Sequence, residues 1–373
     1  MTREYEAFLE SSFAAERSGD AATALEYHRG IPMFTRGRHI HILKVLAGLA
    51  DEMTPWLWAR WAAYQCNRAE DPGTESLLIT RAALDYTLQM FYDGQMQAAY
   101  DEGRDPMKLM ARVAGESWVY HQVCTFELGG MREFVDSLAD GALATSAEWA
   151  RSWDGASMRG LRLEPATDGR LVVTDLKTRQ EIEVLDLGAG TLCVPGGFLV
   201  GRLVDSGTTP ETMFDTTPVV VDQQTAQEVA ASTRGGWITA LTKAIADGRI
   251  ELSALESEDR ELATDVPSLA LIEAGTRPPD LPRVMQQLGE GRDEVGRAAF
   301  RILRVAVEGT FGPDDRAAYV GAAVLNPHAH AEAERELVTP GRDAEWLHWA
   351  ELVPEPAGSR LRRLAEMSAA EAA

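Results

Sequence analysis

The chain has 373 residues, of which 45% are hydrophobic, so it is long enough for two or three domains that each bury a full core. Its 58 acidic residues outnumber its 36 basic ones and give a formal net charge of -22. Such a charge repels phosphate backbones and anionic lipid headgroups, which argues against a broad nucleic-acid-binding surface.

The cysteines and the N-terminal residues bear on the compartment. Cys66, Cys124 and Cys193 are odd in number and far apart, which fits reduced thiols in a reducing compartment. The first residues lack the apolar core of a signal peptide, and no run of about 20 apolar residues predicts a membrane span. We therefore expect a cytoplasmic protein without membrane contact, and the sequence leaves its oligomeric state open.

Residues 1–155 have the pattern of successive helices. Apolar residues such as Phe8, Leu9 and Phe13 recur at spacings of three and four. Gly and Pro residues interrupt the pattern, for example at Pro55. Predicted helices lie near residues 4–18, 21–29, 38–51, 55–69, 75–101, 106–126, 130–139 and 142–153. This region is predicted to be a helical N-terminal domain.

The period changes at Met158. Apolar residues then alternate with polar ones, first at Leu161 and Leu163 and next at Leu171 and Val173. The alternation continues to residue 221 and predicts five or six short antiparallel strands. Closing these strands into a small barrel or curled sheet would remove exposed edges. We assign residues 156–224 to a small antiparallel β domain.

Residues 225–373 return to the helical period. Trp237 and Leu241 lie on one helix face. Further along, Asn326 and Pro327 have the residue types of a helix cap and a first helical position, so they predict a helix start.

The last stretch, residues 357–373, is polar and Ala-rich and is expected to fray. Together the three regions predict a predominantly α-helical α+β fold. It has a helical N-terminal domain, a small antiparallel β-barrel or curled sheet in the middle, and a helical C-terminal region.

Residues 8–31 resemble a tetratricopeptide repeat. Phe8 stands at the family's first aromatic position, and Ser12 and Ala24 stand at its small-residue positions. Gly19 stands at the turn between the two helices. The match covers about 30 of the 373 residues and does not recur. The resemblance implies a helical layer that binds peptides or partner proteins.

The string GRLVVTDLKT at residues 169–178 resembles the strand that carries Asp-x-Lys-Thr in RecB-type PD-(D/E)XK nucleases. In that family, the Asp and a second acid hold a divalent metal, and the Lys positions the attacking water. The resemblance gives these roles to Asp175 and Lys177. It leaves Glu164 or Asp154 as the second acid. The same residues also have the pattern of an ordinary hairpin turn, which is the structural alternative.

No other string predicts a metal or cofactor site. The paired histidines His39 and His41, and likewise His328 and His330, are two residues apart, a spacing that does not share a helix face. The glycine-rich strings lack the pattern of a nucleotide-binding loop. We predict no cofactor and no resident metal.

An aromatic cluster marks the predicted partner-binding site. Trp, Tyr and Arg concentrate binding energy at interfaces, because each presents a large, rigid face with a polar group. The predicted partner-binding residues are Trp58, Arg60, Trp61, Tyr64, Trp118 and Tyr120. Packing in a core between helices is the alternative for all six.

The sequence favours a cytosolic, non-enzymatic scaffold or regulatory adaptor with a protein partner, because it contains no complete catalytic constellation. The alternative is a metal-dependent nuclease or hydrolase that uses Asp175, Lys177 and Glu164. A second carboxylate within roughly 5 Å of Asp175 would favour the nuclease, since both could then bind one metal ion.

Overall fold

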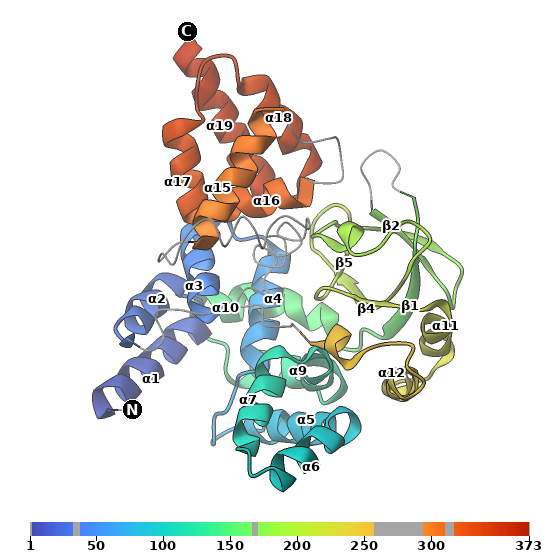
Figure 1. Ribbon diagram of the computed structural model, residues 1–373. Coiled ribbons are helices and arrows are strands. Elements are labelled where there is room, and N and C mark those ends of the chain that lie inside the picture. The colour runs from blue at the N-terminus through green and yellow to red at the C-terminus, as the bar shows by residue number, and fades with distance from the viewer. Residues whose placement is uncertain (1, 33–37, 166–170, 257–293, 310–316, 373) are drawn as a thin grey trace.

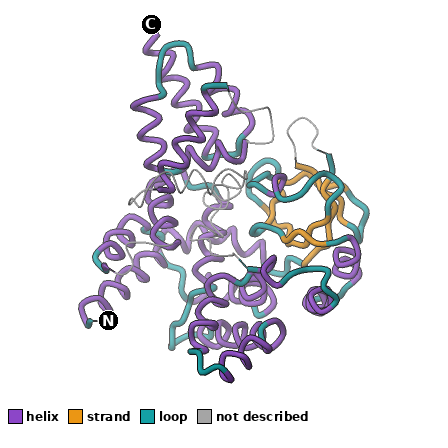
Figure 2. The backbone as a smooth tube through the Cα atoms, viewed as in Figure 1, coloured by secondary structure: helices purple, strands orange, loops and turns teal. Residues whose placement is uncertain are grey.

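The structure is a computed structural model that describes residues 2–32, 38–165, 171–256, 294–309 and 317–372 (Figure 1). Helices occupy both ends of the sequence and a curled antiparallel sheet lies between them, which confirms the predicted helical α+β fold. The strands gather on one side of the molecule (Figure 2). None of the helices in the described ranges has the length and apolarity needed to cross a membrane.

Most of the N-terminal helices begin and end near the boundaries predicted from Gly and Pro residues. They are α1 (Arg3–Ser18), α2 (Ala21–Arg29), α3 (Arg38–Leu49), α4 (Pro55–Cys66), α5 (Ser76–Phe91), α6 (Asp93–Asp101), α7 (Pro106–Glu116), α8 (Trp118–Gln122), α9 (Gly130–Ser137) and α10 (Gly141–Ser146). Two predicted helices were too long. The chain leaves helical geometry at Tyr92, and Ser117 ends α7 and caps α8 by accepting a hydrogen bond from the amide of Tyr120.

Helices α1 and α2 form the predicted hairpin. Gly19 ends α1 with a φ of 85°, a left-handed conformation that favours glycine. Asp20 then caps α2, because its side chain accepts a hydrogen bond from the amide of Thr23 at 2.9 Å. The hairpin turn is therefore specified by these two adjacent residues.

A buried carboxylate ties this hairpin to the next helices. Glu16 on α1 accepts hydrogen bonds from His39 at 2.9 Å, from Arg68 at 3.2 Å and from Gln65. Burial raises the pKa of Glu16, but His39 and Arg68 outweigh burial and lower it to about 2. Glu16 is fully buried, so its charge is stabilised only while these partners stay in place.

The middle region forms one curled antiparallel sheet. Its strands are β1 (Met158–Leu163), β2 (Leu171–Asp175), β3 (Glu181–Val184), β4 (Phe198–Asp205), β5 (Thr212–Phe214) and β6 (Val219–Val221). Their order is β3-β2-β1-β4-β5, and β6 also pairs with β4. Alternating residues such as Leu161, Val173 and Leu199 are fully buried, which is the burial that the period of two predicts.

Two helices after the sheet pack onto it. Helix α11 (Gln223–Ala231) crosses β1, and α12 (Gly236–Ala246) follows it (Figure 1). The contact is possible because Gly160 on β1 has no side chain. A Cβ atom at this position would lie 1.8 Å from the carbonyl oxygen of Ala226 on α11.

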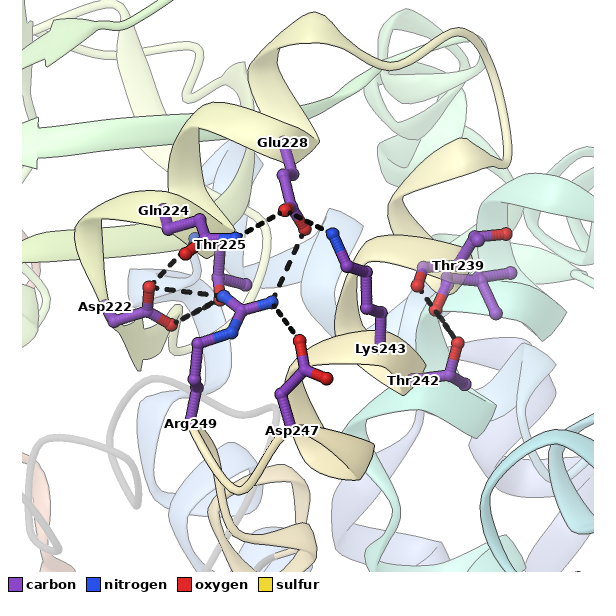
Figure 3. A network of polar contacts seen from close by, with 10 residues as sticks. Asp222, Gln224, Thr225, Glu228, Thr239, Thr242, Lys243, Asp247 and Arg249 are labelled. Atoms are coloured by element: carbon purple, nitrogen blue, oxygen red, sulfur yellow. Dashed lines mark hydrogen bonds and ion pairs between the residues drawn. The ribbon is translucent and has the colours of Figure 1, made fainter.

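Ion pairs join α11 to α12 and the segment after it (Figure 3). Lys243 contacts Glu228 at 2.8 Å, and Arg249 contacts Asp222 at 3.2 Å and Glu228 at 3.5 Å. Asp222 also caps α11 through the amide of Thr225. These contacts fix the turn at residues 232–235.

The C-terminal helices pack on the N-terminal ones. They are α15 (Glu294–Val307), α16 (Ala317–Leu325), α17 (Pro327–Glu336), α18 (Asp343–Leu352) and α19 (Ala357–Ala372). The predicted start of α17 is confirmed, since Asn326 caps it and Pro327 is its first residue. The predicted fraying of the last stretch was wrong. Leu361 and Leu364 on α19 are fully buried, and Ala357 and Ala365 are nearly so, because one apolar face of the helix packs against α16 and α18.

Two of the hydrophobic clusters cross the borders of the three predicted regions. The largest cluster joins Trp61 of α4, Met213 of β5 and Leu303 of α15. A second cluster joins Tyr120 of α8 to Trp237 of α12. The division at residues 156 and 225 stays a prediction, and the packing across it is continuous.

We predict that Gly160→Ala lowers the free energy of unfolding by about 3 kcal/mol, because the new methyl group would overlap the backbone of α11 and force it away from β1. Urea denaturation measures the change. Gly94→Ala on α6 is the control, since a Cβ atom there meets nothing within 4 Å, and it should be neutral or slightly stabilising. Equal stability of the two variants would contradict the close contact.

Candidate functional site

A cavity of about 280 Å³ lies where the three parts of the chain meet. Its walls come from residues 155–160, the end of β2, strand β4, the turn 232–235 and the end of the π-helix Val123–Glu127. We call it the junction cleft. Its charged residues are Glu127, Arg159, Asp175, Lys177, Arg202 and Arg234.

Arg202 on β4 forms the base of the junction cleft. Its side chain is only 3% exposed. It donates hydrogen bonds to Gln122 at 2.7 Å, to the carboxylate of Glu127 and to the carbonyl oxygen of Ala156. Because every nitrogen of the guanidinium has an acceptor, the charge can be buried at this junction.

Aromatic rings complete the surroundings of Arg202. The guanidinium lies 4.6 Å from the ring centroid of Phe126 and 5.9 Å from that of Trp237. The indole of Trp237 donates to Glu127 at 2.8 Å. Burial raises the pKa of Glu127, but Trp237 and Arg202 outweigh burial and hold it below its usual value. Glu127 is therefore ionised at neutral pH.

Asp175 ends β2 and organises a hairpin turn. One oxygen of its carboxylate accepts from the amides of Lys177 at 2.8 Å and Thr178 at 3.1 Å. The other oxygen accepts from Arg159. Burial raises the pKa of Asp175, but these donors outweigh it and hold the pKa below its usual value. Lys177 lies in the turn after the strand.

The two candidate second acids are engaged elsewhere. Glu164 accepts from Thr174 and from Arg162 at 2.8 Å. Thr174 precedes Asp175 on β2, so the two side chains point to opposite faces of the sheet. Asp154 pairs with Arg132 at 3.2 Å. Among the described residues, no group of three or more His, Cys, Asp and Glu side chains is placed to hold a metal ion.

The lining of the junction cleft is positive although the chain is strongly acidic. Four cations face two carboxylates there, whereas the chain as a whole carries a net charge of -22. Arg234 is 73% exposed and pairs with Glu127 at 3.7 Å, and Lys177 is exposed without an ion pair among the described residues. Arg159 is paired with Asp175. Lys177 and Arg234 are therefore the cations of the cleft that an added anion can reach from solvent.

Asp215 lies behind the base of the junction cleft, just after β5. Its Oδ2 accepts a hydrogen bond from Gln122 at 2.6 Å, and the backbone amide of Thr216 is a further donor to the carboxyl group. Burial raises the pKa of Asp215 to about 6, because Gln122, Arg202 and Arg60 only partly offset the loss of solvent.

Four of the six predicted partner-binding residues are buried. Arg60 and Tyr120 are 2% exposed, Trp61 is 1% exposed and Tyr64 is 8% exposed. Arg60 donates to the carbonyl oxygen of Phe214, and the hydroxyl of Tyr120 donates to that of Asn67. These four residues stabilise the core, which is the alternative that the sequence left open.

The remaining two predicted residues are partly exposed and lie in different places. Trp118 meets Trp237 edge to face at 5.8 Å. Trp58 stacks on Trp61 and lines an open groove with Trp149 and Pro55. The structure therefore does not bring the six residues together as one surface.

Only some of the residues that line the junction cleft were predicted from the sequence. Asp175 and Lys177 were singled out, and both line it. Arg202 and Glu127 were missed, because they are 75 residues apart in the sequence and belong to no motif. The helical face that carries Trp237 was a usable signal, since a large aromatic ring on the apolar face of a helix packs against a neighbouring element.

Comparison of the chain with protein-family models, with curated proteins and with solved structures gives no match. The resemblances to the tetratricopeptide repeat and to the nuclease strand therefore rest on the residues that carry them.

We predict that Asp215→Asn changes how stability depends on pH. Between the usual pKa of 3.8 and the folded value of about 6, the folded protein binds more protons than the unfolded chain. The free energy of unfolding of the wild type therefore falls as pH rises through this window. The variant does not lose this stability, because asparagine does not titrate. Its stability relative to the wild type should increase by about 2 to 3 kcal/mol from pH 4 to pH 7.

Urea denaturation across this pH range measures the difference. Glu16 and His28, whose pKa values are lowered to about 2 and about 4, titrate in both proteins and cancel in the comparison. Asp85→Asn, at an exposed position on α5, is the control and should run parallel to the wild type. A parallel curve for Asp215→Asn would contradict the prediction.

Proposed function

We propose that the protein is a non-enzymatic adaptor that holds an acidic side chain or terminus of a protein partner in the junction cleft. The observation that carries the proposal is the positive lining of this cleft in a chain of net charge -22. The net charge of an acidic chain repels anions on average, so a local excess of cations favours binding of an anion there.

The geometry supports binding more than catalysis. The carboxylates of Glu127 and Asp175 both accept hydrogen bonds from cations, and both have lowered pKa values, so neither is suited to remove a proton near neutral pH. Arg202 has its three nitrogens occupied and serves as a rigid base. Lys177 and Arg234 are exposed and can close on an incoming carboxylate.

The proposal includes a cytoplasmic location. Cys66 and Cys124 are free and buried, and Cys193 is free and half-buried. Free thiols are usual in a reducing compartment, where cellular reductants keep cysteines from pairing. A small cleft also accepts one charged group at a time, which suits a peptide better than a nucleic-acid strand.

We predict that the double variant Lys177→Ala, Arg234→Ala binds a fluorescein-labelled hexaglutamate peptide at least tenfold more weakly than the wild type. Each substitution removes one charge-assisted contact, and the loss of one such contact typically costs about 1.5 to 3 kcal/mol. Fluorescence anisotropy at fixed ionic strength measures the dissociation constant.

The control is the double variant Arg29→Ala, Lys108→Ala, which removes the same two charges from exposed positions on α2 and α7. It should bind the peptide as the wild type does. The proposal fails if the wild type does not bind the peptide, or if both double variants lose the same affinity.

The alternative is a metal-dependent nuclease or hydrolase. In its favour, Asp175 and Lys177 both line the junction cleft. We rank it second because Arg159 and two amides already occupy the carboxylate of Asp175. We expect no Mg²⁺- or Mn²⁺-dependent cleavage of plasmid DNA by the wild type. Cleavage that disappears in Lys177→Ala would reverse this ranking.

A further inference from the structure

We propose that binding of an anionic group in the junction cleft is coupled to uptake of a proton by Asp215. This inference rests on the proposed function of the cleft and adds a control of that site by pH. The coupling would make the protein bind its acidic partner more tightly in mildly acidic conditions than at neutral pH.

A continuous chain of hydrogen bonds connects the two places. Arg202 donates to Glu127 on the cleft side and to the carbonyl oxygen of the Gln122 side chain at 2.7 Å. The amide nitrogen of the same Gln122 donates to Asp215 at 2.6 Å. One side chain therefore separates the guanidinium at the base of the cleft from the carboxyl group.

Charged groups reach Asp215 from two elements besides its own segment. Arg202 on β4 and Arg60 on α4 both favour its ionised form, and Gln122 on α8 is a neutral donor. Asp215 is 6% exposed, so it has little solvent to replace these interactions. The backbone amide of Thr216 is a further donor, but burial outweighs all of these groups, so the ionised carboxylate is only partly stabilised.

An anion in the cleft would change this balance. Its negative charge beside Arg202 offsets part of the positive field that keeps Asp215 ionised, so Asp215 holds its proton more firmly. By linkage, a protonated Asp215 leaves more of the field of Arg202 available to the anion. The described residues that line the cleft include no histidine, and the lowered pKa values of Glu127 and Asp175 keep both ionised near neutral pH.

The experiment measures the dissociation constant of labelled hexaglutamate at pH 5.5, 6.5 and 7.5 for the wild type and for Asp215→Asn. Asparagine keeps the size of the side chain and imitates its protonated form. We expect the variant to bind about fivefold more tightly than the wild type at pH 7.5 and equally at pH 5.5. Ionisation of the peptide is common to both proteins and cancels in this comparison.

A second measurement does not depend on the variant. Calorimetric titration of the wild type at pH 6.5, in two buffers of different ionisation heat, gives the number of protons taken up, and we expect a fraction of one proton. Asp85→Asn is the control and should behave as the wild type.

The outcomes separate the two proposals. One outcome contradicts only the coupling. In it, hexaglutamate binds and the double variant Lys177→Ala, Arg234→Ala binds it more weakly, but the wild type and Asp215→Asn share one pH dependence and no proton is taken up. The binding site would then stand without the coupling. If the wild type binds no peptide at any pH, the proposed function fails and the coupling fails with it.

Discussion

The burial of one guanidinium organises the centre of this protein. Arg202 is 3% exposed, and its charge is tolerable only because two different parts of the chain supply three acceptors for it. Glu127 and Gln122 come from the N-terminal helices, and the carbonyl of Ala156 comes from the entry to the sheet. Trp237 on α12 then packs over the pair and donates to Glu127. Loss of Glu127 would leave the buried charge without its carboxylate partner, and loss of either neutral acceptor would leave a buried N–H group without a hydrogen bond.

The fold was largely predictable because its signals are local. A period of two specified the strands, and the residue types of caps and turns specified boundaries such as Pro327 and Gly19. The junction cleft was only partly predictable because its contacts are not local. Arg202 meets Gln122 across 80 residues, and no spacing rule connects them. The aromatic cluster had a clear sequence pattern but an ambiguous meaning. Trp, Tyr and Arg at helical spacing are typical both of an interface and of a core, and only the burial of each side chain distinguishes these two interpretations.

The overall charge of the chain and the charge of its cleft have different physical roles. A net charge of -22 keeps anions away and limits association with other acidic surfaces. The cations of the cleft lie around two carboxylates that are themselves satisfied, with Arg202 buried at the base and Lys177 and Arg234 exposed at the surface. If the cleft binds an acidic group as proposed, the net charge of the chain would add to its selectivity, because that charge disfavours anions at other places on the surface.

The contact between the two ends of the chain has a consequence for synthesis on the ribosome. Gly48 on α3 lies against Pro327, and Arg360 on α19 donates to Glu52 and to the carbonyl oxygen of Gly48, both at 2.6 Å. Ile40 and Leu43 of α3 already pack against α2, but the face of α3 around Gly48 meets α16, α17 and α19 only when they have been made, some 300 residues later. Nascent chains must carry this face exposed for most of translation, and in that interval it is a natural target for chaperones that bind apolar segments.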